Sequence, residues 1–111
     1  ANGVVAYYFH RTLRCMTCLA IEKNAKEAIE IAYLDALDDG RLTWLPANYE
    51  EPANQHFVQD FALDTSTLVL VEMRDGKPAR WKALPKVWEL LAEPGKFQEY
   101  VWAEVEEYLG G

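Results

Sequence analysis

Residues 4–18 read VVAYYFHRTLRCMTC, and this stretch joins a β-rich segment to a closely spaced pair of cysteines. The segment Val4–His10 carries large apolar side chains on both of its alternating faces, which is typical of a central strand covered on both sides. From Cys18 onward, apolar residues recur at helical spacing, with charged residues between them. The sequence therefore predicts a buried strand followed by a long helix. The expected inner face of that helix comprises Cys18, Ile21, Ala25, Ala28, Ile29 and Ala32.

The next segments continue the alternation of strand and helix. The acidic breaker at 38–40, Asp-Asp-Gly, ends the long helix, and Leu42–Leu45 follows as a second strand, which completes a βαβ unit. The segment Glu51–Leu63 is amphipathic and has a proline suited to a first helical turn. It predicts a second helix, with an inner face formed by Ala53, Phe57 and Phe61.

The last third of the chain predicts a hairpin and two helices. The β-prone runs Thr67–Arg74 and Lys77–Ala83 flank a two-residue Asp-Gly loop, a strong signal for an antiparallel hairpin. Helical patterns cover Leu84–Glu93 and Pro94–Leu109. The order β-α-β-α-β-β-α, with no internal repeat and no long linker, predicts a single α/β domain over residues 1–111.

Composition and charge exclude several classes of function. The chain has eleven basic and eighteen acidic residues, a net charge of −7, and no basic cluster, so we expect no nucleic-acid partner. No apolar run approaches the roughly eighteen residues of a membrane span. The start at Ala1-Asn2-Gly3 without methionine suggests a trimmed N-terminus, which allows either an exported or a cytoplasmic protein.

Both cysteines of the chain lie where the long helix is expected to begin. Unpaired N–H groups and the positive end of the helix dipole stabilise a thiolate there, so we expect a lowered pKa for Cys15. Residues 1–34 carry four bases and three acids, net +1, whereas residues 35–64 carry one base and seven acids, net −6. The bases Arg11 and Arg14 should stabilise the thiolate further. Cys18, one turn deeper, is close enough to form a disulfide with Cys15.

The strand VVAYYFH, the motif CMTC, the βαβ unit and the later hairpin together resemble the thioredoxin superfamily over most of the chain. The resemblance implies a three-layer sandwich in which helices flank a mixed four-stranded sheet. It also implies a thiol–disulfide oxidoreductase, with Cys15 as the attacking thiol, Cys18 as the resolving thiol, and no cofactor beyond their disulfide. We expect a monomer that acts on protein or small disulfides and exchanges electrons with a redox partner.

Two departures from the family pattern affect the expected site. Ser66, within Thr65-Ser66-Thr67, stands where the family has a cis-proline before the hairpin, in the turn expected to face substrate. We expect either a trans peptide bond or a locally different turn at Thr65-Ser66. Arg14 stands where the family has a tryptophan, and the first strand has no acidic residue. His10 is then the nearest candidate for proton transfer. Alternatively, His10 is a strand-end histidine that is hydrogen-bonded to the backbone or to water.

Three other interpretations of the cysteines remain. They could be two small buried apolar residues. They could instead bind a metal or an iron–sulfur cluster shared between two chains, although His10 and His56 are too few to complete a zinc site in one chain. In the third interpretation the domain is a binding module without redox turnover. Its binding face would include some of the tryptophans Trp44, Trp81, Trp88 and Trp102.

Overall fold

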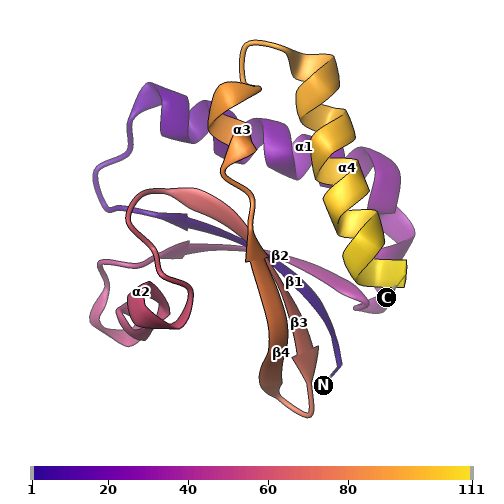
Figure 1. Ribbon diagram of the computed structural model, residues 1–111, viewed down its shortest axis with the longest axis horizontal. Helices are drawn as coiled ribbons and strands as arrows, with labels where there is room; N and C mark the ends of the chain where they lie inside the picture. The colour runs from indigo at the N-terminus through magenta and orange to yellow at the C-terminus, as the bar shows by residue number, and fades with distance from the viewer. Residues whose placement is uncertain (1, 111) are drawn as a thin grey trace.

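The computed structural model describes residues 2–110 and contains one mixed four-stranded sheet of order β2-β1-β3-β4 (Figure 1). Strand β1 (Gly3–His10) lies inside the sheet, as its apolar residues on both faces predict. It runs parallel to β2 (Leu42–Asn48) and antiparallel to β3 (Thr67–Arg74). The expected βαβ unit is confirmed, and β1 places its C-terminal end, His10, against Arg14, the residue before the first cysteine.

The hairpin of β3 and β4 (Lys77–Ala83) is also confirmed. Its two loop residues have positive backbone φ angles, 54° at Asp75 and 79° at Gly76. A two-residue loop with both φ angles positive matches the twist of the flanking strands, and this explains the preference for Asp-Gly. β4 is consequently an edge strand, and most of its side chains are exposed.

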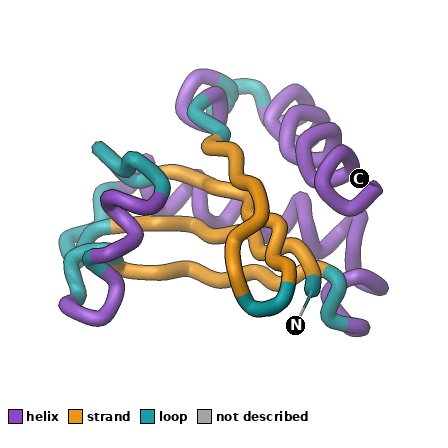
Figure 2. The backbone as a smooth tube through the Cα atoms, turned by 60° about the horizontal axis from the view of Figure 1, so that its bottom comes forward, coloured by secondary structure: helices purple, strands orange, loops and turns teal. Residues whose placement is uncertain are grey.

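Helices cover both faces of the sheet (Figure 1). Helix α1 (Met16–Asp39), the short α3 (Lys86–Glu89) and α4 (Pro94–Gly110) pack on one face. The 3-10 turn η1 (Pro52–Asn54) and α2 (His56–Asp60) lie on the other, near one end of the strands (Figure 2). The mixed α/β class and the flanking helices agree with the expectation from sequence.

Two separate cores hold these layers together because β1 and β3 bury side chains on both faces. The larger core joins α1, α3 and α4 to the sheet, with Tyr8, Leu70 and Phe97 among its fully buried side chains. The smaller core, under α2, comprises Phe9, Ala47, Phe61, Leu63, Val69 and Val71. Phe57 and Tyr7 pack against its edge, so α2 is held mainly by aromatic contacts.

The expected inner face of the long helix is correct only in its first half. Ile21, Ala25, Ala28 and Ile29 are buried, but Ala32 is exposed and Ala36 is buried instead. The helix is kinked one residue after Ala32, at Tyr33, whose backbone is non-helical (φ −128°, ψ 31°). The Tyr33 hydroxyl donates to the backbone carbonyl of Trp102 at 3.0 Å, which ties the kink to α4. The buried Ala36 lies seven residues after Ile29, so the apolar stripe continues beyond the kink.

Three other predicted boundaries were wrong. The second strand extends beyond Leu45 to Asn48, and it accommodates Pro46 because β2 is an edge strand that pairs only with β1. The helix expected over Glu51–Leu63 is broken into η1 and α2, and Ala53 is exposed. The helix expected over Leu84–Glu93 is only α3, because the chain turns there from the end of β4 towards α4.

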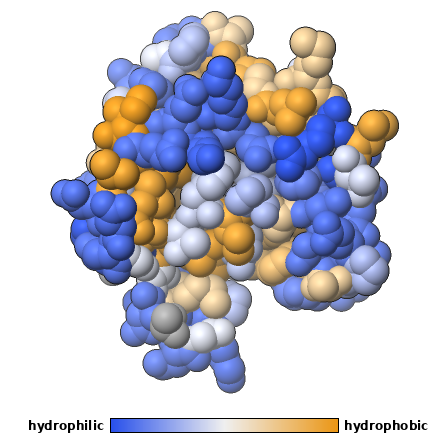
Figure 3. Space-filling view, turned by 180° about the vertical axis from the view of Figure 1, so that it is seen from behind, coloured by the Kyte–Doolittle hydropathy of each residue, from blue (hydrophilic) through white to orange (hydrophobic). Residues whose placement is uncertain are grey.

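In the view from behind, hydrophilic residues cover much of the visible face, and the apolar residues form separate patches between them (Figure 3). Among residues 2–110, no helix combines the length and apolar character that crossing a membrane requires.

Candidate functional site

Cys15 and Cys18 form a disulfide at the start of α1, with their Cα atoms 5.1 Å apart. Cys15 is the N-cap of the helix, in an extended conformation (φ −88°, ψ 161°), and its Sγ accepts the backbone N–H of Cys18 at 3.0 Å. A sulfur in this position takes the place of a capping oxygen, and it would carry negative charge next to the positive end of the dipole. The predicted position of the pair is therefore confirmed.

The two sulfur-bearing residues differ in exposure. Cys15 is exposed, whereas Cys18 is partly covered by the body of the fold. The buried hydroxyl of Tyr8, on β1, donates to the backbone carbonyl of Cys18 at 2.8 Å and fixes the first turn of α1 to the sheet. Attack by or on an external sulfur is consequently possible at Cys15 and hindered at Cys18.

Arg14 lies beside the disulfide in a network with a histidine and a glutamate. Its Nη1 contacts Glu22 Oε1 at 2.5 Å, and its Nη2 lies 2.7 Å from Nε2 of the buried His10. Nδ1 of His10 lies 2.9 Å from the backbone carbonyl of Arg11. Arg14 Nε also donates to His10 Nδ1 at 3.0 Å, so the guanidinium contacts both ring nitrogens. The tautomer of His10 decides which ring nitrogen donates and which accepts.

Arg14 is therefore ion-paired, and its expected stabilisation of the Cys15 thiolate stays a prediction. Glu22 pairs with Arg14, and only 20% of the Glu22 side chain is exposed, although helical periodicity places it on the solvated face. Glu22 and Tyr8 are the residues that the sequence analysis missed. The available signal was spacing, because Glu22 follows Cys18 by four residues and therefore shares its side of α1.

His10 occupies the position of the strand-end histidine that hydrogen-bonds to the backbone, one of the two interpretations from sequence. Its role in proton transfer stays a prediction. His56, the other histidine, lies on α2 and pairs with Asp60 at 2.8 Å on the surface. Within residues 2–110, no three His, Cys, Asp or Glu side chains are grouped so as to hold a metal ion.

The side chain of Arg11 is bonded to the loop that follows β2. Its Nε donates to the hydroxyl of Tyr49 at 2.7 Å, and the neighbouring N–H of Thr12 donates to Glu50 Oε1, also at 2.7 Å. The hydrogen bond to Tyr49, and more weakly the charge of Glu50, raise the pKa of Arg11. The loop that carries Arg11 is therefore bonded to a phenol and a carboxylate of the loop after β2.

The turn Thr65-Ser66-Thr67 lies at the same end of the sheet as His10, because Thr67 pairs with Phe9. Thr65 is exposed, whereas Ser66 and Thr67 are buried. The carbonyl of Ser66 accepts the indole N–H of Trp88 at 2.9 Å. No peptide bond between residues 2 and 110 is cis, in agreement with the expected trans bond at Ser66. Contact of this turn with a substrate stays a prediction.

The tryptophans do not form a common exposed face. Trp44, Trp88 and Trp102 are partly buried against the larger core, and the indole of Trp102 donates to the carbonyl of Ala28 at 2.7 Å. Trp81 is the more exposed one, at 42%, and it packs edge-on against Phe61. Three of the four therefore have a structural role, which removes the main sequence support for a tryptophan-lined binding surface.

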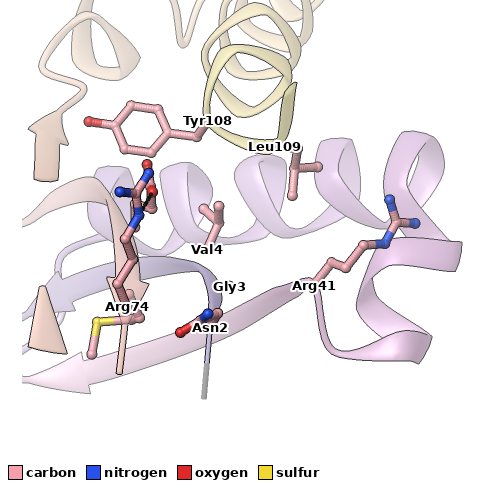
Figure 4. Close-up of a pocket in the computed structure, with 9 residues that line it drawn as sticks. Asn2, Gly3, Val4, Arg41, Arg74, Tyr108 and Leu109 are labelled. Carbon is pink, nitrogen blue, oxygen red and sulfur yellow. Dashed lines mark hydrogen bonds and ion pairs between the residues drawn. The ribbon is translucent and has the colours of Figure 1, made fainter. Parts of the chain in front are cut away.

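Hollows lie at both ends of the sheet. One, of about 470 Å³, is lined by His10, Arg14 and surrounding residues of β1, β2, η1 and α2. The other, of about 260 Å³, lies at the start of β1, with Arg74 and Tyr108 on one side and Arg41 on the other (Figure 4). Arg41 there pairs with Asp39. Only the first hollow gives solvent access to the network around Arg14.

Tyr8 should make the protein sensitive to alkali. Burial above all, and then the charge of Glu22, raise the pKa of its phenol from 10.0 to about 12, although Arg14 lowers it in part. The unfolded chain therefore releases this proton first, and the stabilisation present below pH 10 is lost as the pH rises towards 12. We expect the free energy of unfolding to fall by roughly 2 kcal/mol over this range from Tyr8.

Denaturant titrations at a series of pH values, with phenolate absorbance, measure this effect. Tyr8→Phe is the control variant, since it keeps the ring and removes the ionisable group, and its unfolding free energy should fall less steeply. Equal slopes for the two proteins would contradict the assignment. Tyr33, whose pKa burial also raises to about 12, should contribute equally to both proteins.

Comparisons with known proteins do not name a family. No family model matches the chain, and no curated protein matches it. Among solved structures, one described as "Structure of a malarial protein" is similar over 86% of this chain and 96% of its own, with 16% sequence identity and a TM-score of 0.49. The function of the site therefore has to be argued from its own geometry.

Proposed function

We propose that this protein is a thioredoxin-like thiol–disulfide oxidoreductase that works through the Cys15–Cys18 pair. The observation that carries the proposal is the disulfide at the N-terminus of α1, in which the exposed Cys15 caps the helix. A mixed four-stranded sheet with helices on both faces agrees with the arrangement that the superfamily resemblance implies. Neither a metal nor an organic cofactor is needed for this chemistry.

The proposed reaction transfers two electrons in two exchange steps. The Cys15 thiolate attacks one sulfur of a substrate disulfide, a mixed disulfide forms, and the first substrate thiolate leaves and takes a proton. The Cys18 thiol then loses its proton and attacks the Cys15 sulfur, which releases the second substrate thiol and leaves Cys15–Cys18 oxidised. Overall, one protein dithiol and one substrate disulfide give one protein disulfide and two substrate thiols.

The surface around Cys15 favours a protein substrate. Leu13 and Met16 flank the cysteine in the chain and are 90% and 89% exposed. Exposed apolar side chains are unfavourable in water unless a partner covers them, and an unfolded segment with apolar residues near its disulfide would do so. A small hydrophilic disulfide would gain little from this contact.

Replacing both apolar residues with serine is expected to discriminate between substrates. Leu13→Ser combined with Met16→Ser should raise KM for an unfolded protein disulfide about fivefold, since partial burial of two such side chains contributes on the order of 1 kcal/mol. The rate with oxidised glutathione should change by less than about twofold. Ile31→Ser combined with Leu34→Ser, at exposed positions further along α1, is the matched control. An equal effect of both double variants would contradict a docking role for Leu13 and Met16.

The proposed activity itself is tested by equilibrating the purified protein with a series of glutathione redox buffers, followed by thiol alkylation and mass measurement. We expect a single two-electron transition that Cys15→Ser abolishes. Metal content and molecular mass in solution, measured on the same sample, test the alternative of a metal or iron–sulfur cluster shared between two chains. If Cys15 and Cys18 form no disulfide in any of the buffers, the proposal is overturned. A dimer that contains bound metal would favour the shared metal or iron–sulfur site instead.

A further inference from the structure

The guanidinium of Arg14, the residue before Cys15, is fixed by two side chains. Two groups anchor its guanidinium: Glu22 Oε1 at 2.5 Å from Nη1, and His10 Nε2 at 2.7 Å from Nη2. The contact with Glu22 is an ion pair, whereas the contact with His10 is a hydrogen bond to an imidazole ring. The side chains of the ion pair are only 29% and 20% exposed, so solvent screens the pair less than it would on an open surface.

The spacing along α1 connects this ion pair to both cysteines. Cys15, Cys18 and Glu22 follow one another at intervals of three and four residues, so they lie along one side of the helix. At a rise of about 1.5 Å per residue, Glu22 lies roughly 10 Å from Cys15 along the helix axis. Arg14 precedes Cys15 in the chain and reaches back to Glu22. The positive charge nearest to Cys15 in sequence is therefore cancelled by a carboxylate two turns away.

We propose that Glu22 is a positioning residue that neutralises Arg14 and thereby keeps the Cys15–Cys18 pair more reducing than Arg14 alone would make it. An uncompensated guanidinium would stabilise the Cys15 thiolate, favour the reduced form and make the disulfide a stronger oxidant. This inference rests on the proposed function, and it adds the residue that sets the redox equilibrium.

The other charged groups at this end of the fold do not replace Glu22. Arg11 is exposed and is bonded to Tyr49, with Glu50 close to it. Tyr8 is neutral below its raised pKa, and Glu51 lines the hollow that His10 and Arg14 share. Glu22 is the carboxylate that forms an ion pair with Arg14, and the charges of these two residues sum to zero.

Three variants test the inference because the two single substitutions should change the pKa of Cys15 in opposite directions. Glu22→Gln leaves Arg14 bound to His10 with its charge exposed, so the pKa of Cys15 should fall by about half a unit or more, an effect of about threefold on the equilibrium. Arg14→Gln leaves the Glu22 charge uncompensated, so the pKa should rise. The double variant should return close to the wild-type value. Glu30→Gln, at an exposed position on the same helix, is the control.

Two readouts are needed. The first is ultraviolet titration of the thiolate in a Cys18→Ser background, where only Cys15 ionises. The second is the equilibrium between the protein disulfide with two reduced glutathione molecules and the protein dithiol with glutathione disulfide. We expect Glu22→Gln to shift this equilibrium about threefold towards the dithiol, and Arg14→Gln to shift it in the opposite direction.

Shifts of the same sign in the two single variants, or no shift in either, would overturn the inference, because a merely structural ion pair predicts no opposition of sign. Circular dichroism and urea midpoints establish that each variant folds. If the wild-type protein fails to equilibrate with glutathione, the proposed oxidoreductase function fails. The thiolate titration still decides the role of Glu22 in that case, so the two failures are distinguishable.

Discussion

Cys18→Ser is expected to stop turnover and to trap the protein as a mixed disulfide with its substrate. The exposed Cys15 can still attack a substrate sulfur, but the resolving thiol that would displace the reduced substrate is gone. We expect the steady-state rate of disulfide reduction to fall by at least about a hundredfold, the size of loss typical when a group essential to one step is removed. Non-reducing electrophoresis and mass spectrometry should detect the adduct, and reductant should reverse it.

Cys15→Ser provides the matched control for this experiment. It should lose activity to the same extent and yet form no adduct, because the remaining Cys18 is partly covered and its carbonyl is held against β1 by Tyr8. Adducts of equal yield in the two variants would contradict the assignment of Cys15 as the attacking thiol. A Cys18→Ser protein that turns over normally would contradict the role of Cys18 as the resolving thiol.

Phe97→Ala is expected to have the largest effect on stability. Phe97 is 1% exposed and anchors α4 in the larger core between that helix and the sheet. Truncating a fully buried phenylalanine removes its transfer free energy and leaves a cavity, at a cost of about 3–5 kcal/mol. Because a domain of this size is stabilised by about 5–15 kcal/mol, urea denaturation should show most of its stability lost.

The control for Phe97→Ala lies on the same helix. Leu109 is only partly buried, so Leu109→Ala should cost about 1 kcal/mol. Both variants should keep the urea dependence of the wild-type protein, which indicates unchanged two-state unfolding. Equal losses at the two positions would mean that α4 is not anchored at Phe97. A loss below about 1 kcal/mol at Phe97 would contradict its burial.

Local sequence patterns predicted the secondary-structure elements in which backbone preference and burial agree. The alternation in Val4–His10, the Asp-Gly loop and the terminal helix each agree with the structure because backbone preference and burial favour the same conformation there. The cysteine pair at the helix start was predictable for the same reason. The exact position of Cys15, as the N-cap residue of α1, came from the structure.

Prediction failed where long-range contacts outweigh local preference. The kink at Tyr33 depends on a hydroxyl that reaches α4, at Trp102, and no local signal contains that partner. The helix expected over Leu84–Glu93 shortens to one turn because its ends must connect β4 to α4. Ala53 is exposed although its spacing matches that of Phe57, because the chain breaks the helix between them.

The sequence by itself determined the α/β class, the hairpin and the position of the two cysteines, because each depends on residues close together in the chain. Only the tertiary structure decided the electrostatics of the site. Glu22 appears as a solvated charge in helical periodicity, yet the loop that carries Arg14 folds back over it. The pairing of His10, Arg14 and Glu22 requires β1, the loop and α1 to meet in space. Electrostatic interactions depend on such distances, which local periodicity does not encode.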